Sequence, residues 1–123
     1  MSKTALTLYV EDDRKLGFAI RETAMAHNWP SVQLCRTLAE ARQSLTQETE
    51  YGRIVLDVAL LDGVGTDLLP DLAQAEFLGD IIIVSGIIEK DWTDDVLARA
   101  AECGLSIRFL EKTGNWVKEA FGR

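Results

Sequence analysis

The sequence predicts an α/β protein built on a doubly wound, five-stranded parallel sheet of strand order 2-1-3-4-5, with helices on both faces. Short apolar runs rich in Val, Ile and Leu alternate along the chain with longer amphipathic stretches. Strands that are buried on both faces read as continuous apolar runs. An alternation of this length implies parallel strands joined by right-handed helical crossovers. For five such strands, the order 2-1-3-4-5 is the expected one.

Five apolar runs are predicted to form the strands of this sheet. They cover residues 5–10, 32–36, 54–56, 81–84 and 107–110. No purely apolar run exceeds the length of residues 81–84, which is far too short to cross a bilayer.

The stretches between the strands predict the helices, because apolar residues recur in them at helical spacing. Four helices are expected around residues 16–24, 38–45, 68–75 and 96–101, and a short fifth around residues 116–121. Thr37 is placed to cap the second helix. Pro70 falls in the first turn of the third, where its missing N–H costs little. Gly104 is expected to close the fourth in a left-handed conformation.

Length, charge and cysteine content restrict the function. With 123 residues, 47% of them hydrophobic, we expect a single domain over residues 1–123. A net charge of −7 disfavours contact with nucleic acid or with an anionic membrane. Residues 1–4 hold no apolar run, so we expect no signal peptide and a cytoplasmic location. Cys35 and Cys103 match no disulfide scaffold or zinc motif, and we expect both to be free, buried thiols.

Polar and charged side chains follow four of the predicted strands. Ligands of doubly wound sheets bind at the carboxyl ends of the strands, near the point where the winding changes direction. We therefore expect these side chains to converge at one edge of the sheet. They are Glu11, Asp12 and Asp13 after the first strand, Asp57 after the third, Ser85 and Gly86 after the fourth, and Glu111 and Lys112 after the fifth.

Each of these residue types has a role if a phosphoryl group is transferred to Asp57. A dianionic phosphoryl group is repelled by a carboxylate, and a hard cation such as Mg²⁺ offsets that repulsion. Glu11 and Asp12 supply carboxylates for the cation, and the backbone carbonyl of Ala59 is placed to supply another oxygen. Lys112 can pair with one phosphoryl oxygen, and Ser85 can donate a hydrogen bond to a second.

Over nearly its whole length the sequence resembles the receiver domains of response regulators, which have a flavodoxin-like fold. The segments that carry the resemblance are 8–13, 54–65, 82–86 and 109–112. The resemblance implies a two-component signalling switch rather than an enzyme, although such a domain assists its own phosphotransfer and dephosphorylation. A histidine kinase or a phosphotransfer protein would donate the phosphoryl group to Asp57 with Mg²⁺ as cofactor. The phosphorylated domain would then control an output protein or domain.

The register of the family assigns the acidic residues. It makes Asp12 the direct metal ligand and Glu11 a ligand that acts through water, together with Asp57 and the Ala59 carbonyl. Asp13 would cap the first helix, where an anion favours the helix dipole. The family's aromatic switch position, which precedes the lysine by three residues, falls on Phe109.

The sequence also departs from the family. Thr113 stands where the family has a cis-proline after the lysine, and Leu61 replaces another usual proline. The spacing from Ser85 to Gly104 is longer than usual, and the extra length lies in residues 87–95. We expect these residues to form a long loop whose Trp92 takes part in switching. The alternative is that its apolar side chains fold back onto the fourth helix.

The main alternative is a pseudo-receiver, in which the same fold serves as a protein-interaction module without phosphorylation. A phosphatase of the haloacid dehalogenase type needs a second Asp two residues after the nucleophile, and Ala59 stands there. The single histidine, His27, belongs to a surface turn, so a hydrolase with a charge-relay triad is not expected.

Overall fold

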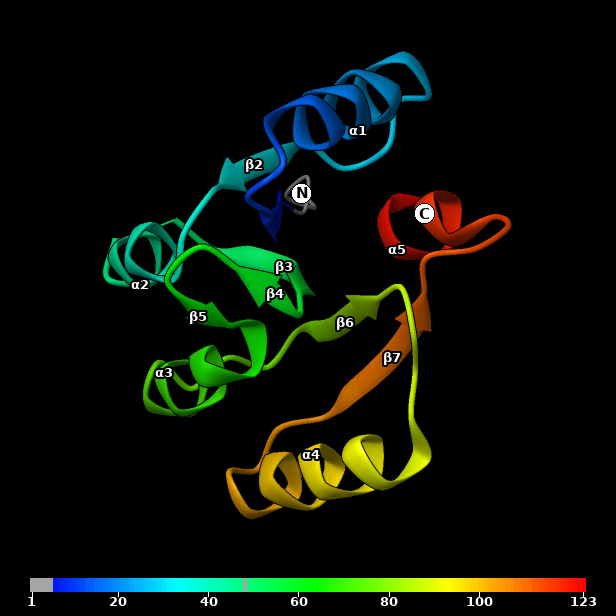
Figure 1. The fold of residues 1–123 in the computed structure, drawn as a ribbon. Helices are drawn as coiled ribbons and strands as arrows, with labels where there is room; N and C mark the ends of the chain where they lie inside the picture. Colours follow the sequence, from blue (N-terminus) through cyan, green and yellow to red (C-terminus); the bar gives the residue numbers. More distant parts are fainter. Residues whose placement is uncertain (1–5, 48) are drawn as a thin grey trace.

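A computed structural model of the chain describes residues 6–47 and 49–123, and its fold is a parallel sheet between two layers of helices (Figure 1). The order of the main sheet is β2-β1-β3-β6-β7, and each neighbouring pair is parallel. This order is the predicted 2-1-3-4-5, so the doubly wound fold is confirmed. The strands of this sheet are β1 (Leu6–Val10), β2 (Val32–Cys35), β3 (Tyr51–Asp57), β6 (Asp80–Ser85) and β7 (Ile107–Glu111).

The strand boundaries differ from the predicted ones at several ends. The predicted start of the first strand, Ala5, lies outside the described residues. β3 begins at Tyr51 rather than at Ile54, because Tyr51 and Arg53 still pair with β1. Strand pairing therefore extends past the apolar run that marked this strand in the sequence.

The helices cover both faces of the sheet, as predicted. In Figure 1, α1 and α5 lie on one face, and α2, α3 and α4 lie on the other. Their bounds are α1 (Arg14–Ala26), α2 (Leu38–Leu45), α3 (Leu69–Gln74), α4 (Lys90–Glu102) and α5 (Trp116–Phe121). Two clusters of buried apolar side chains fill the two layers. Leu38, Leu72 and Val96 belong to the cluster under α2, α3 and α4. Ile20 and Phe121 belong to the cluster under α1 and α5.

The expected helix caps are confirmed. The Asp13 carboxylate accepts hydrogen bonds from the backbone N–H groups of Lys15 and Leu16, and so caps α1. The Thr37 hydroxyl accepts from the N–H of Glu40 at the start of α2. Pro70 lies in the first turn of α3, and Gly104 follows α4 with a φ of +73°. These caps fix where the helices begin and end, and hence where the loops at the strand ends lie.

A small hairpin that the sequence did not indicate follows β3. It consists of β4 (Ala59–Leu60) and β5 (Gly63–Val64), which pair antiparallel. Asp62 lies in the turn of this hairpin. Its carboxylate accepts hydrogen bonds from the backbone N–H groups of Leu38 at 2.9 Å and Ala39 at 3.2 Å. The bond from Leu38 is the main reason that the pKa of Asp62 lies below its usual range. The hairpin thus provides a second cap for α2 from a distant part of the chain.

The expected loop over residues 87–95 is wrong in extent. α4 begins at Lys90, so residues 90–95 are helical and the loop between β6 and α4 is short. Ile87 is 74% exposed in this loop, whereas Trp92 is half-buried on α4. The expectation of two buried thiols also fails in part, because Cys35 is buried but Cys103 is exposed.

Candidate functional site

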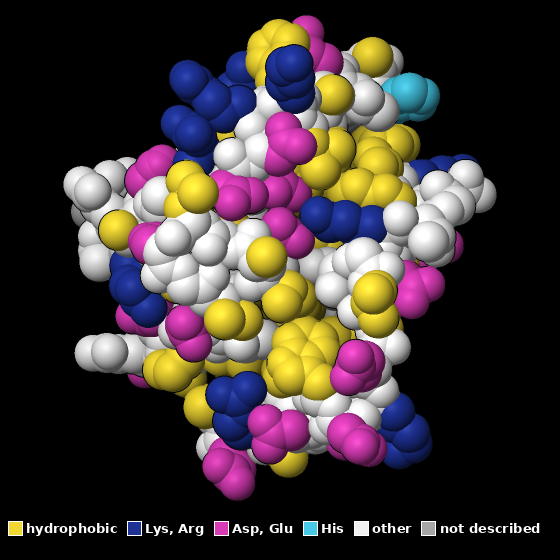
Figure 2. Space-filling view, in the orientation of Figure 1, with side chains coloured by type: hydrophobic (Ala, Val, Ile, Leu, Met, Phe, Trp, Pro, Cys, Tyr) yellow, Lys and Arg dark blue, Asp and Glu magenta, His cyan; other side chains and the backbone are white. Residues whose placement is uncertain are grey.

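Side chains of opposite charge gather at the carboxyl ends of β1, β3 and β7. The parallel register pairs Val10 with Leu56, Asp57 with Val84, and Ser85 with Glu111, so the strands end side by side. Figure 2 shows acidic side chains clustered in the middle of one face of the molecule, with basic side chains beside them. The convergence expected from the strand-end rule is present at this edge for Glu11, Asp12, Asp57 and Lys112.

Three carboxylates form the acidic part of the site. One carboxylate oxygen from each of Glu11, Asp12 and Asp57 lies within 4.8 Å of the other two. Glu11 is 4% exposed and Asp57 is 8% exposed, while Asp12 is half-buried. Desolvation raises the pKa of Asp12, and the hydrogen bond and charge of Glu11 raise it further. A compact set of carboxylate oxygens with this much mutual repulsion fits a hard divalent cation such as Mg²⁺.

Lys112 lies between two of these carboxylates. Its Nζ is 3.1 Å from Asp57 Oδ1 and 3.2 Å from Glu11 Oε1. Burial lowers the pKa of Lys112, but the hydrogen bonds and charges of Asp57 and Glu11 outweigh it, and the pKa is raised. The ammonium group therefore remains charged beside Asp57. Trp116, whose ring centroid lies 5.8 Å from the same Nζ, is closer to the site than its position in the sequence indicated.

The loop after Asp57 is shaped by close backbone contacts. Asp57 Oδ1 also accepts a hydrogen bond from the N–H of Val58 at 3.0 Å. The N–H of Gly65 donates to the Val58 carbonyl at 2.8 Å. A Cβ atom at Gly65 would lie 2.0 Å from the backbone oxygen of Asp57. Glycine is therefore required at this position, since any side chain would displace the backbone that carries Asp57.

Ser85 ends β6 with its hydroxyl bonded to the following loop. Its Oγ donates to the carbonyl of Ile87 at 2.9 Å and accepts from the N–H of Ile87 at 3.3 Å. A cavity of about 230 Å³ opens beside it, lined by Val58, Ser85, Ile87, Glu89 and Trp92. The hydroxyl hydrogen of Ser85 thus holds the loop in its present conformation.

Phe109 and Trp92, the two expected switch residues, are in contact. Their ring centroids are 5.3 Å apart and their planes meet at 67°, an edge-to-face arrangement. Both side chains are half-buried and pack against the core under α4. Trp92 belongs to α4 itself and packs on β7, so the alternative of a loop folded back onto the fourth helix is also wrong for this residue. The contact joins the start of α4 to β7.

One residue near the carboxylates was not predicted from the sequence. Tyr9 is fully buried, and its hydroxyl donates a hydrogen bond to Glu11 Oε1 at 2.9 Å. Burial, and then the charge and hydrogen bond of Glu11, raise the pKa of Tyr9, so the hydroxyl stays protonated. The sequence signal from which Tyr9 could have been predicted is the two-residue period of a strand, which places Tyr9 and Glu11 on the same side of the chain.

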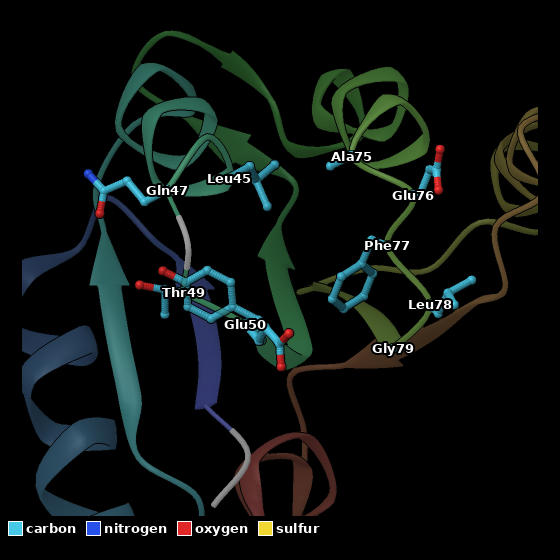
Figure 3. Close-up of a pocket in the computed structure, with 10 residues that line it drawn as sticks. Leu45, Gln47, Thr49, Glu50, Ala75, Glu76, Phe77, Leu78 and Gly79 are labelled. Atoms are coloured by element: carbon cyan, nitrogen blue, oxygen red, sulfur yellow. The ribbon is translucent and has the colours of Figure 1, made fainter. Parts of the chain in front are cut away.

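A cavity larger than the one beside Ser85 lies away from the acidic cluster. It has a volume of about 530 Å³ and lies at the start of β3, whereas Asp57 ends that strand. Figure 3 shows Leu45, Phe77 and Leu78 among its lining residues. The group of acidic side chains suited to a metal ion is at the other edge of the sheet and forms the candidate site.

No helix within residues 6–47 and 49–123 is long and apolar enough to cross a membrane. The peptide bonds of the described residues, including that between Lys112 and Thr113, are trans.

Comparisons with known proteins give matches among solved structures. No family model matches the sequence, and a search of curated proteins finds no match. The HemR receiver domain from Leptospira biflexa is 26% identical, with a TM-score of 0.72, and the match covers 94% of this chain and 86% of that one. The chemotaxis protein CheY4 from Vibrio cholerae is 16% identical, with a TM-score of 0.75 and coverage of 92% and 90%.

A third similar structure comes from Burkholderia pseudomallei. It is a response regulator protein with a phosphorylated aspartic acid, a calcium ion and citrate. It is 16% identical, with a TM-score of 0.74, and the match covers 94% of this chain and 63% of that one.

Proposed function

We propose that this chain, which belongs to the receiver domains of response regulators, accepts a phosphoryl group on Asp57 from a histidine kinase or a phosphotransfer protein. Such domains act as signalling switches rather than as classical enzymes. The observation that carries the proposal is that Lys112 Nζ lies 3.1 Å from Asp57 Oδ1, inside the cluster of Glu11, Asp12 and Asp57. A phosphorylated aspartic acid in the similar Burkholderia protein supports it.

The proposed cofactor is Mg²⁺. We assign Asp12 and Asp57 as direct ligands, the Ala59 carbonyl as a third, and Glu11 as a ligand through water. When bound, the cation supplies the positive charge that allows a phosphoryl group to approach the carboxylates. The calcium ion of the Burkholderia protein supports a divalent cation in this fold.

The chain's own residues perform the transfer by position and charge. A carboxylate oxygen of Asp57 forms a bond to phosphorus while the bond from phosphorus to the donor's imidazole nitrogen breaks. The electron pair of that bond stays on the imidazole, which takes a proton. Lys112 pairs with a phosphoryl oxygen, and it is already held beside Asp57 by its ion pair.

Ser85 connects phosphorylation to the loop that follows it. Its hydroxyl has one hydrogen, now donated to the Ile87 carbonyl. If that hydrogen is donated to a phosphoryl oxygen instead, the loop loses one of its bonds. A hydrogen bond to a charged group contributes about 1.5–3 kcal/mol, which shifts a two-state population by about one to two powers of ten. Phosphorylation would then control an output protein in the cytoplasm through this loop and α4.

The proposal is tested by adding a small phosphodonor and Mg²⁺ and measuring the mass of the chain. A gain of one phosphoryl group, located on Asp57 by peptide mapping, is the expected result. The alternative is a pseudo-receiver that binds a partner without phosphorylation, and Thr113 in place of the family's proline is the observation that favours it. No mass gain under conditions that label a known receiver domain would support this alternative.

Mg²⁺ is expected to stabilise the fold, because it relieves the repulsion among Glu11, Asp12 and Asp57 and binds the folded state. At a tenfold excess over Kd the gain is about 1.4 kcal/mol, or a rise in Tm of roughly 4–8 °C. Thermal melts with and without Mg²⁺ measure it. Asp12→Ala should lose most of the shift, while Asp91→Ala on α4 should keep it. An equal shift in Asp12→Ala would contradict the assigned site.

Trp92 is expected to report activation by a change of fluorescence when beryllofluoride and Mg²⁺ mimic the phosphoryl group. The ring lines the cavity that contains Ser85 and Ile87, so a rearranged loop alters its surroundings. Trp116 also lies near Lys112, so its fluorescence must be distinguished from that of Trp92. The signal should persist in Trp116→Phe and disappear in Trp92→Phe. The opposite pattern would remove Trp92 from the mechanism.

A further inference from the structure

Tyr9 connects the buried core to the acidic cluster. Its ring is fully buried and packs edge-to-face on Phe121, with centroids 4.8 Å apart. The same ring carries a hydroxyl that donates to Glu11 Oε1 at 2.9 Å. Because the surrounding core fixes the ring, the position of this donor is fixed as well.

Glu11 is held by donors on both of its carboxylate oxygens. Oε1 accepts from Tyr9 and from Lys112 Nζ, and Oε2 accepts from the backbone N–H of Asp13 at 3.2 Å. Lys112 has a flexible side chain and also pairs with Asp57, so it can leave Glu11 when a phosphoryl group arrives. The Tyr9 hydroxyl is therefore the side-chain donor to Glu11 that does not depend on the state of Asp57.

We propose that Tyr9 is a positioning residue that fixes the carboxylate of Glu11 for octahedral coordination of Mg²⁺. The inference rests on the proposed function, in which Glu11 holds the cation through a water molecule. Outer hydrogen-bond partners orient the ligands of metal ions, and their loss weakens metal affinity. Without the Tyr9 hydroxyl, Glu11 would adopt more orientations, and binding would have to select one of them.

The choice of cation separates positioning from simple stabilisation. Mg²⁺ requires a nearly ideal octahedron, whereas Ca²⁺ accepts variable geometry and coordination number. A Glu11 carboxylate that is no longer held by Tyr9 should therefore lower the affinity for Mg²⁺ more than the affinity for Ca²⁺. A purely structural role of Tyr9 would lower stability and leave the ratio of the two affinities unchanged.

The experiment measures the affinities for Mg²⁺ and Ca²⁺ by amide NMR titration of the wild-type chain and of Tyr9→Phe. The substitution removes one oxygen atom and keeps the buried ring. We expect the Kd for Mg²⁺ to rise about tenfold, the lower end of the effect of losing such a partner, and the Kd for Ca²⁺ to rise less. Tyr51→Phe is the matched control, because Tyr51 is the other tyrosine and lies at the opposite end of the sheet. It should leave both affinities unchanged.

A second pair of variants tests whether Tyr9 acts through Glu11. In a Glu11→Gln background, adding Tyr9→Phe should change the Mg²⁺ affinity by less than twofold. An equal or tighter Mg²⁺ affinity in Tyr9→Phe, or an unchanged ratio of Mg²⁺ to Ca²⁺, overturns the inference while the proposed site stands. If the wild-type chain binds neither cation at this cluster, the metal site of the proposed function fails, and the role of Tyr9 fails with it.

Discussion

Replacing Asp57 with Asn is expected to abolish covalent labelling of the chain by a small phosphodonor in the presence of Mg²⁺. The amide nitrogen and oxygen of Asn do not replace the carboxylate oxygen that would attack phosphorus. The substitution also removes the ion pair with Lys112, whose Nζ lies 3.1 Å from Asp57 Oδ1. The labelled fraction, measured by intact mass, should fall to background.

The control for this variant is Asp62→Asn, which changes an acidic residue in the nearby hairpin. Asp62 bonds to backbone N–H groups of α2 and not to the acidic cluster, and the single side-chain oxygen of an Asn can still accept the bond from Leu38. It should be labelled like the wild-type chain. Equal labelling of Asp57→Asn and the wild type would show that another residue accepts the phosphoryl group, and the proposed function would be wrong.

Gly65→Ala is expected to be the most destabilising conservative change near the site. Its Cβ atom would lie 2.0 Å from the backbone oxygen of Asp57, so the backbone must move. Overpacking of this kind costs about 3 kcal/mol or more, which corresponds to a fall in Tm of roughly 10 °C or more. Because the displaced oxygen belongs to Asp57, labelling by a phosphodonor should fall as well.

Gly86→Ala is the matched control for stability. Gly86 lies in the loop after β6, and a Cβ atom built there meets no other atom within 4 Å. Its Tm should stay within about 2 °C of the wild-type value, as for other substitutions that touch nothing. If both variants melt alike, the close approach at Gly65 does not limit the stability of the fold.

The acidic cluster could be predicted from sequence because strand ends are easy to recognise. Val10 and Leu56 end apolar runs, and Glu11 and Asp57 follow them directly. Once the strands are parallel, their carboxyl ends must meet at one edge of the sheet, and the register of β1 and β3 confirms this. The roles assigned to Glu11, Asp12, Ser85 and Lys112 remain predictions.

The start of α4 could not be predicted because the usual signal is missing. Helices commonly begin after a side chain that caps the first turn, but Glu89 at this position makes no side-chain cap bond. Thr93 and Asp94, further along, are residue types that favour a start. The segment therefore resembled a loop, although its Trp92 packs on Phe109.

The hairpin and the contact of Trp116 with Lys112 could not be predicted from the periodicity of the sequence. β4 and β5 have two residues each, which is too short for an alternating pattern to be seen. The contact of Trp116 with Lys112 depends on the turn between them, in which Gly114 has a φ of +57°. Such turns set the direction of the chain through a few dihedral angles, and the residue types leave several directions open.

The bonds from Leu38 and Ala39 to Asp62 couple the start of α2 to the hairpin. Proteins open locally in cooperative units, and a unit includes the elements whose bonds must break together. If the hairpin opens, the first turn of α2 loses two acceptors at once, so fraying of the helix and motion of the hairpin are coupled. The hairpin follows Asp57 directly along the chain. The fluctuations of α2 are therefore linked to the backbone that carries the carboxylate.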